Sequence, residues 1–299
     1  MEIRDLWAIR NQGHAKPQEH WGWPIAIYLY LAGMGAGSFI IGMIINWVLN
    51  PSRLIQLPVF HVSFDLPKAA TLWGAMVAAI GSPFLILDLG IKKRFIYACL
   101  NPKTSWVARG FLILSTFILF GLATLAVSAL PHLGLRQETS LLRTLEIVSF
   151  IFAFGTAIYT GILLKSVKYM PLWNTPLLEV LFLSSALTAG LMGITLSTAG
   201  YTLLISSEDS LARLVHGLVR VGQGLIFIEG FVLALYFFSR SRIKDQSNDS
   251  VQLLISGDMK ILFWGGLFCR GLFFPSPFYS CAPLSRNLIF SYLAQASSY

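Results

Sequence analysis

The sequence contains few charged residues for its length. Only 12% of its 299 residues are Asp, Glu, Lys or Arg, whereas 55% are hydrophobic. Soluble domains usually carry about 25% charged residues, so this composition indicates an integral membrane protein instead. The formal net charge of +8 comes from basic residues in short loops between apolar runs. Membrane topology and lipid headgroups account for such residues better than nucleic acid does, so no nucleic-acid partner is expected.

Cysteine is also scarce, and this limits the metal chemistry of the chain. Cys99, Cys269 and Cys281 lie far apart and form no C-x-x-C pair. The chain alone is therefore not expected to bind an iron–sulfur cluster or a four-ligand structural zinc. The first twenty residues are polar and contain neither the apolar core of a cleaved signal peptide nor a twin arginine. We therefore expect the first span to remain as a signal anchor.

Histidines within apolar runs are equally rare. Of the five, His14, His20, His61, His132 and His216, only the last lies well inside such a run. Membrane subunits that carry haem b bind it between pairs of intramembrane histidines. A haem site is therefore not expected.

Seven apolar runs reach or approach the roughly twenty residues that a helix needs to cross about 30 Å of hydrocarbon. They cover residues 21–48, 69–89, 105–130, 145–164, 176–199, 211–239 and 261–274, and a weak eighth covers 284–294. Backbone polar groups in a bilayer must be paired, so these runs predict α-helices. The predicted fold is an all-α integral membrane protein, a helical bundle of seven or eight transmembrane helices.

The expected organisation is a polar segment at 1–20, a four-helix bundle at 21–170 and a second bundle at 171–299 with an atypical or truncated last helix. A faint internal echo agrees with two halves. "PIAIYLYLAGMGAGSF" and "PLLEVLFLSSALTAGLMG" both place apolar residues and then a small-residue cluster after a proline. Such clusters usually mark close helix packing.

The distribution of Lys and Arg predicts the orientation. If the spans alternate, twelve of these residues lie on the amino-terminal side and five on the other. The twelve are Arg4, Arg10, Lys16, Lys92, Lys93, Arg94, Lys103, Lys165, Lys168, Arg240, Arg242 and Lys244; the five are Arg53, Lys68, Arg136, Arg143 and Arg213. The positive-inside rule then places the amino terminus in the cytoplasm. A basic face can equally be a docking surface for a partner subunit.

Ionisable residues inside a span are candidates for function. His216 and Arg220 are four residues apart and share a helix face, whereas Glu229 points roughly the other way. Two interpretations stay open for this set: a route for protons, or side chains that merely meet water and headgroups near the surface.

Two tyrosines are predicted at a common depth. Tyr28 lies about seven residues into the first span, and Tyr159 lies six residues before Lys165, where the fourth span returns to the same side. At 1.5 Å per residue, both phenols lie roughly 10 Å below one surface. They could hydrogen-bond the ring of a quinone, or they could belong to the aromatic belt that membrane proteins carry at both interfaces.

The segment "LILDLGIKKRFIYACLNPKTSWVARG" is the strongest local signal. Its aspartate at the end of a span, followed by Leu-Gly, a basic cluster, Asn-Pro, Ser-Trp and Gly, resembles the NrfD-like family of polysulfide reductase membrane subunits. "HWGWPIAIYLYLAGMGAGSF", Tyr159-Thr160-Gly161 and "LFLSSALTAGLMG" resemble other segments of that family in the same order. Asp88 and Arg94 could alternatively form a local ion pair that fixes the loop.

The resemblance implies an eight-helix subunit without haem or metal. It would anchor an iron–sulfur ferredoxin-like subunit, with a molybdopterin catalytic subunit beyond it, in the inner (cytoplasmic) membrane. Such a subunit exchanges electrons with the quinone pool, here menaquinone, and does not contain the catalytic centre itself. The segment after Phe274 is unlike the eighth span of the family.

The resemblance also implies roles for individual residues. Tyr28 and Tyr159 would bind the quinone ring, although Tyr28 stands where the polysulfide reductase branch has a histidine. The other candidates have three roles: His20, Trp21 and Trp23 at the entrance; Asp88, Glu179, Glu229, His216 and Arg220 in proton transfer; Lys92, Lys93 and Arg94 in partner docking. A secondary transporter or proton-translocating protein, and a purely structural anchor without quinone, are the alternatives.

Overall fold

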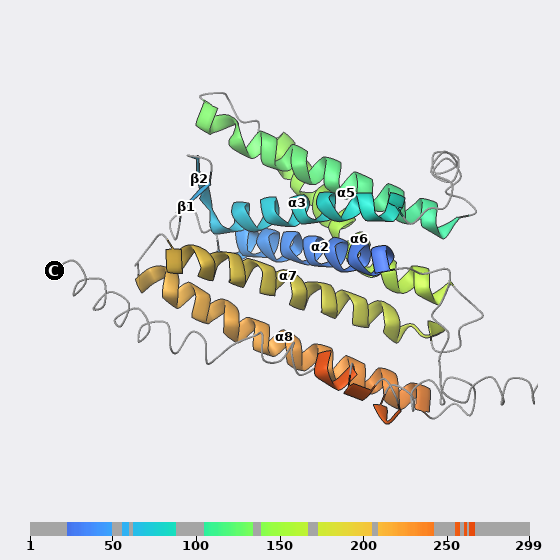
Figure 1. Ribbon diagram of the computed structural model, residues 1–299. Helices are drawn as coiled ribbons and strands as arrows, with labels where there is room; N and C mark the ends of the chain where they lie inside the picture. Colours follow the sequence, from blue (N-terminus) through green and yellow to red (C-terminus); the bar gives the residue numbers. More distant parts are fainter. Residues whose placement is uncertain are drawn as a thin grey trace, which may run out of the picture.

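The computed structural model describes residues 23–49, 56–59, 62–87, 105–133, 139–166, 173–204, 209–241, 255–257, 260–261 and 263–266. Six long helices and one short hairpin form most of this part of the chain, together with a 3-10 turn and a few helical residues between 255 and 266 (Figure 1). In chain order they are α2 (Trp23–Leu49), β1 (Gln56–Val59), β2 (Val62–Asp65), α3 (Leu66–Leu87), α5 (Trp106–Ala129), the 3-10 turn η2 (Leu130–Leu133), α6 (Thr139–Lys165), α7 (Leu177–Leu204) and α8 (Asp209–Ser241).

The helices confirm the prediction of a multi-pass helical membrane protein. Five of them contain stretches that are long and apolar enough to cross a bilayer: Pro24–Val48, Trp106–Ala129, Thr139–Lys165, Leu177–Thr198 and His216–Arg240. Helix α3 covers most of the second predicted run. The weak eighth run lies outside the described residues, and the seventh is described only at 261 and 263–266.

The small hairpin between α2 and α3 is an element that the sequence interpretation missed. β1 and β2 pair antiparallel, with Gln56 opposite Asp65 and Val59 opposite Val62. The expectation of an all-α chain is correct for the spans, but this loop is partly strand. Four-residue strands are at the lower limit of the length over which apolar periodicity is informative, so pairing across the turn is what identifies them here.

The start of α5 has an N-cap, and the start of α6 lies outside the predicted apolar run. α5 begins at Trp106 because the Ser105 hydroxyl accepts a hydrogen bond from the backbone N–H of Ala108 (3.3 Å), as an N-cap does. α6 begins at Thr139, six residues before the predicted start at Leu145. A helix can continue beyond the hydrocarbon core, where an apolar run no longer marks it.

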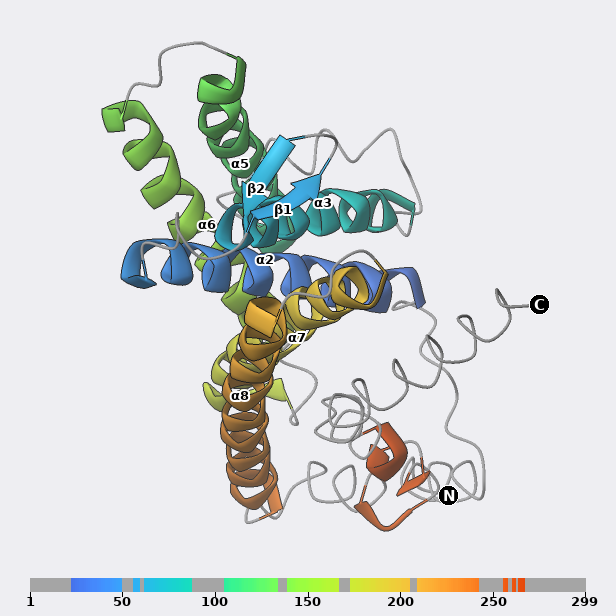
Figure 2. The ribbon, with the colours of Figure 1, turned by 90° about the vertical axis from the view of Figure 1, so that its left-hand side faces the viewer.

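Helix α2 lies at the centre of the arrangement. It contacts α3, α6 and α7, while α5 contacts both α3 and α6, so α2, α3, α5 and α6 close a ring. α7 packs on α2 and α6, and α8 packs on α7 (Figures 1 and 2). The proposed boundary between two bundles near residue 170 stays a prediction.

Small residues let α2 approach two neighbours closely, as predicted. A Cβ on Gly35 would lie 2.5 Å from the Gly74 carbonyl oxygen on α3, and a Cβ on Gly74 would lie 2.5 Å from the Gly35 carbonyl oxygen. On the α7 side, a Cβ on Gly37 would overlap the backbone of Ala186, and a Cβ on Gly190 would overlap the backbone of Gly37 and Ser38. The Ser38 hydroxyl donates to the Gly190 carbonyl oxygen there (3.0 Å). The two segments of the internal echo therefore pack directly against each other.

The core of the ring is apolar, and so is much of its outside. Phe39 of α2 and Phe117 of α5 are fully buried and meet edge to face, with ring centroids 5.2 Å apart. By contrast, Phe227 is 82% exposed and Leu119 is 67% exposed. Apolar side chains facing outward along a long helix match lipid rather than water.

Candidate functional site

The first turns of α5 and the last turns of α6 meet at one end of the ring. There the buried Tyr159 of α6 donates its hydroxyl proton to the backbone carbonyl oxygen of Trp106 (2.8 Å). The phenol ring lies directly over Gly110, since a Cβ at that position would overlap Cζ, Cε1 and the hydroxyl oxygen of Tyr159. The hydroxyl is thus fixed by a backbone atom of the neighbouring helix.

Tyr28 reaches the same region from α2. It is 3% exposed and belongs to the buried cluster that also contains Ala157 of α6 and Ala186 of α7. It lies close enough to Tyr159 for an electrostatic interaction between the two phenol groups. Tyr30, two residues further along α2, is 55% exposed instead. The structure therefore brings together the two tyrosines that the sequence placed at one depth, and it separates them from the outward-facing Tyr30.

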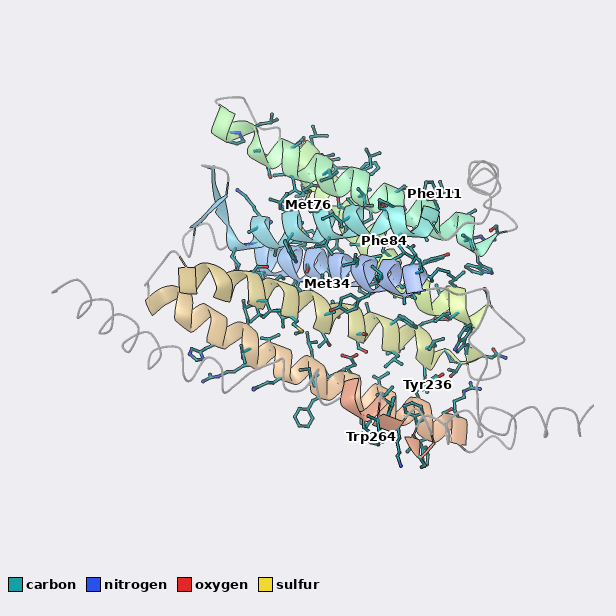
Figure 3. All side chains as sticks on the ribbon, viewed as in Figure 1. Met34, Met76, Phe84, Phe111, Tyr236 and Trp264 are labelled. Carbon is teal, nitrogen blue, oxygen red and sulfur yellow. The ribbon has the colours of Figure 1, made fainter. Side chains whose placement is uncertain are left out.

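Aromatic and cationic groups lie beside this pair. The Arg109 guanidinium lies over the indole of Trp106, 4.4 Å from the ring centroid, a distance typical of a cation–π contact. Phe84 of α3 packs against the cluster that contains Tyr28, toward the same end of the bundle (Figure 3). The Tyr28 phenol therefore lies among apolar side chains, and the residue whose carbonyl binds Tyr159 makes the cation–π contact.

Glu179 lies at the same end, in the first turn of α7. Its Oε1 accepts a hydrogen bond from Nζ of Lys165, the last residue of α6, at 2.8 Å. The two backbones are close here because a Cβ on Gly161 would lie 2.5 Å from the Glu179 Cα. With 29% of its side chain exposed, Glu179 connects the packed end of the bundle to its surface.

Arg240 is a residue that the sequence interpretation used only in the charge count. It is buried, and its guanidinium donates to the backbone carbonyl oxygen of Asn174 in the α6–α7 connection. It also interacts electrostatically with Tyr236, one turn earlier on α8. The position of a basic residue at the end of a span was the available signal, but it fits a headgroup contact equally well.

Glu146 is a second residue without a predicted role, and it lies toward the other end of the bundle. Its carboxylate accepts from the indole N–H of Trp47 (3.1 Å) and the side-chain amide of Asn46 (3.5 Å), both on α2. Since α6 runs thirteen residues from Glu146 to Tyr159, the two sites are about 20 Å apart along the helix. Glu146 therefore joins α2 to α6 but does not belong to the tyrosine site.

The remaining candidates whose side chains the structure describes lie on α8, not on the helices that form this site. His216 and Arg220 are exposed on α8, and Glu229 is half-buried on the same helix. His20, Trp21, Asp88, Lys92, Lys93 and Arg94 lie outside the described residues, and Trp23 is described only as the first residue of α2. Within the described ranges, no three His, Cys, Asp or Glu side chains gather as metal ligands would.

The chemistry of the tyrosine site is hydrogen bonding in an apolar setting. Two phenols within a membrane span can donate or accept hydrogen bonds to a polar ring, while the surrounding side chains favour an apolar ligand. A carboxylate lies nearby at the surface. This arrangement suits an aromatic or quinonoid ring with polar substituents better than it suits an ion.

Comparisons with known proteins agree with this description. The sequence model of a family described as "Polysulphide reductase, NrfD" matches residues 11–286. The protein is 29% identical to the C chain of polysulfide reductase from Wolinella succinogenes, over 85% of its own length and 81% of that relative. It is 26% identical to the protein NrfD of Escherichia coli, over 85% of its own length and 82% of that relative. A protein NrfD homolog of Haemophilus influenzae is 24% identical, over 87% and 83% of the two sequences.

Proposed function

Because this chain belongs to the NrfD polysulphide reductase family, we propose that it is the quinone-interacting membrane anchor of a multisubunit oxidoreductase. It exchanges electrons between the menaquinone pool and a partner iron–sulfur ferredoxin-like subunit, which is followed by a molybdopterin catalytic subunit. The single observation that carries this proposal is the burial of both Tyr28 and Tyr159 within the spans, near enough for an electrostatic interaction between their phenols.

The residues of this end fit a quinone ring. The ring needs an apolar slot and a few hydrogen-bonding groups at headgroup depth. Tyr28 and Tyr159 offer two buried hydroxyls, and Tyr28 lies in an apolar cluster that also contains Ala157 and Ala186. A bound quinol supplies two electrons together with two protons. The chain's own residues must therefore orient the ring and carry protons to the surface.

Glu179 is the best placed of the proposed proton carriers. Its carboxylate lies at the tyrosine end and is partly exposed, so it can pass a proton to water. The bond from Lys165 holds it in place without burying it. Glu229 is half-buried on α8 and Asp88 lies outside the described residues, and their roles, like those of His216 and Arg220, stay predictions.

The partner-facing side follows from charge. Lys92, Lys93 and Arg94 would dock the iron–sulfur subunit electrostatically, and His20, Trp21 and Trp23 would shape the quinone entrance. We propose that the protein lies in the inner membrane with its amino terminus in the cytoplasm, because basic residues are more numerous on that side. Accessibility of a cysteine introduced at residue 2 to a membrane-impermeant reagent in intact cells would contradict this orientation.

The experiment that tests the function combines composition and activity. The complex is purified through this chain, its partners are identified by mass spectrometry, and quinone is extracted from the same sample. Quinol-linked turnover is then compared among Tyr28→Phe, Tyr159→Phe and the matched control Tyr30→Phe. Loss of one hydrogen bond weakens binding about twofold to tenfold, so we expect the first two variants to slow turnover at low quinol concentration and the third to match the wild type. Absence of quinone, or equal turnover of all three variants, would contradict the proposal.

A further inference from the structure

The hydroxyl of Tyr159 has a single proton, and that proton is already used. It is donated to the Trp106 carbonyl oxygen at 2.8 Å. The carbonyl belongs to the first turn of α5, which the Ser105 cap holds in place. The acceptor is therefore a fixed backbone atom, and the direction in which the Tyr159 proton points is fixed with it.

Gly110 determines the position of the ring as well. A side chain at this position would overlap Cζ, Cε1 and the hydroxyl oxygen of Tyr159, so only glycine admits the phenol here. The backbone N–H of Gly110 also interacts with the Tyr159 oxygen, which leaves one of the two lone pairs of that oxygen for a ligand. Gly110 and the Trp106 carbonyl together form a slot on α5: the phenol ring packs on Gly110, and its hydroxyl donates to the carbonyl oxygen.

We propose that this slot makes Tyr159 a hydrogen-bond acceptor toward the ligand, so that the site binds hydroquinone more tightly than quinone. Gly110 is then a positioning residue, since it acts through Tyr159. The inference rests on the proposed quinone site at Tyr28 and Tyr159, and it adds which redox form that site prefers.

The preference for hydroquinone follows from which groups of each redox form can donate or accept a hydrogen bond. A quinone carbonyl can only accept a hydrogen bond. Tyr159 could donate to it only by giving up its hydrogen bond to Trp106, and the Trp106 carbonyl would lose that bond. A hydroquinone hydroxyl can donate to the remaining lone pair of the Tyr159 oxygen while the bond to Trp106 stays intact. One hydrogen bond gained or lost in this way corresponds to about twofold to tenfold in affinity.

The test is equilibrium binding, without turnover. The full-length chain in lipid nanodiscs is titrated under anoxic conditions with a short-chain naphthoquinone and with the naphthoquinol made by its reduction. We expect the wild type to bind the naphthoquinol about twofold to tenfold more tightly. Tyr159→Phe should bring the ratio of the two dissociation constants close to one.

Gly110→Ala should abolish the preference too, because the added Cβ displaces the phenol. Gly224→Ala is the matched control on α8, where a Cβ meets nothing within 4 Å in the described part of the chain. In the double variant Tyr159→Phe/Gly110→Ala, the second change should not alter the ratio further, because the residue it positions has lost its hydroxyl. A purely structural role for Gly110 would weaken both ligands equally. Circular dichroism shows whether Gly110→Ala folds. If it does not, the ratio of the two dissociation constants in Tyr159→Phe alone tests the inference.

The outcomes separate the two proposals. Equal affinities in the wild type, tighter binding of naphthoquinone, or a wild-type ratio in Tyr159→Phe would overturn the inference and leave the quinone site standing. Binding of neither form by the wild-type chain would overturn the proposed function and the inference with it.

Discussion

The close contact of Gly35 and Gly74 predicts that Gly35→Ala loosens the packing of α2 on α3. A Cβ at Gly35 would lie 2.5 Å from the Gly74 carbonyl oxygen and 2.7 Å from the Ala78 amide nitrogen. Ordinary contacts begin at 3.4 Å. The shortest separation must therefore grow by about 0.9 Å, the difference between 3.4 and 2.5 Å. Both obstructing atoms are backbone, so no side-chain rotation relieves the overlap.

The size of the effect follows from two opposing terms. Overpacking a tight interface costs about 1–3 kcal/mol, whereas alanine is favoured over glycine within a helix by about 1 kcal/mol. Gly224→Ala gains the second term without the first, because its Cβ meets nothing within 4 Å among the described residues. The difference between the two variants therefore isolates the steric cost, and we expect Gly35→Ala to be less stable than Gly224→Ala by about 1–3 kcal/mol.

The assay is unfolding in mixed micelles by titration with a denaturing detergent, followed by circular dichroism. Gly74→Ala should behave like Gly35→Ala, since a Cβ there meets the Gly35 carbonyl oxygen at the same 2.5 Å. A Gly35→Ala protein as stable as Gly224→Ala would refute the reasoning that backbone contact limits residue size at this position.

Three further predictions concern polar contacts between helices. Thr124 and Ser149 share a hydrogen bond (3.0 Å) between α5 and α6, so a double-mutant cycle to alanine should give a coupling of about 0.6 kcal/mol in thermal unfolding; purely additive losses would contradict it. Lys165→Glu should destabilise the end of the bundle by no more than about 1 kcal/mol, because the pair with Glu179 is partly exposed. The exchanged pair Lys165→Glu/Glu179→Lys should recover the loss at low salt, and an unrecovered loss would argue against the pair. Glu146→Gln should keep an acceptor for the two donors on α2 and stay near wild-type stability, while Glu146→Leu should lose about 1 kcal/mol; equal melting temperatures would mean that these bonds contribute nothing.

Some features of this protein were readable from the sequence because they depend on local composition. Apolar runs of about twenty residues specify membrane helices wherever the rest of the chain lies, and family membership rests on motifs in order along the chain. The prediction that Tyr28 and Tyr159 share one depth also came from counting residues, because a helix rises by a fixed distance per residue.

Other features needed contacts between helices. Counting along a helix fixes depth but not the direction a side chain faces relative to its neighbours, so the sequence could not tell the buried Tyr28 from the exposed Tyr30. The partner of Tyr159 is a backbone carbonyl 53 residues away. Every residue has such a carbonyl, so the residue type does not indicate which one accepts the bond. Gly110 is the last residue of the Asn-Pro, Ser-Trp and Gly motif in the sequence. Glycine is required there because the Tyr159 ring packs on it from another helix.

The sequence by itself therefore determined the membrane class, most of the helix positions and the family, because these depend on hydrophobicity and pattern along one chain. Only the tertiary structure decided which polar groups meet. It joined Tyr159 to Trp106, Glu179 to Lys165 and Glu146 to α2. The physical reason is that hydrogen bonds and close backbone contacts act over a few ångströms between helices, and their pairing depends on how each helix is rotated about its axis.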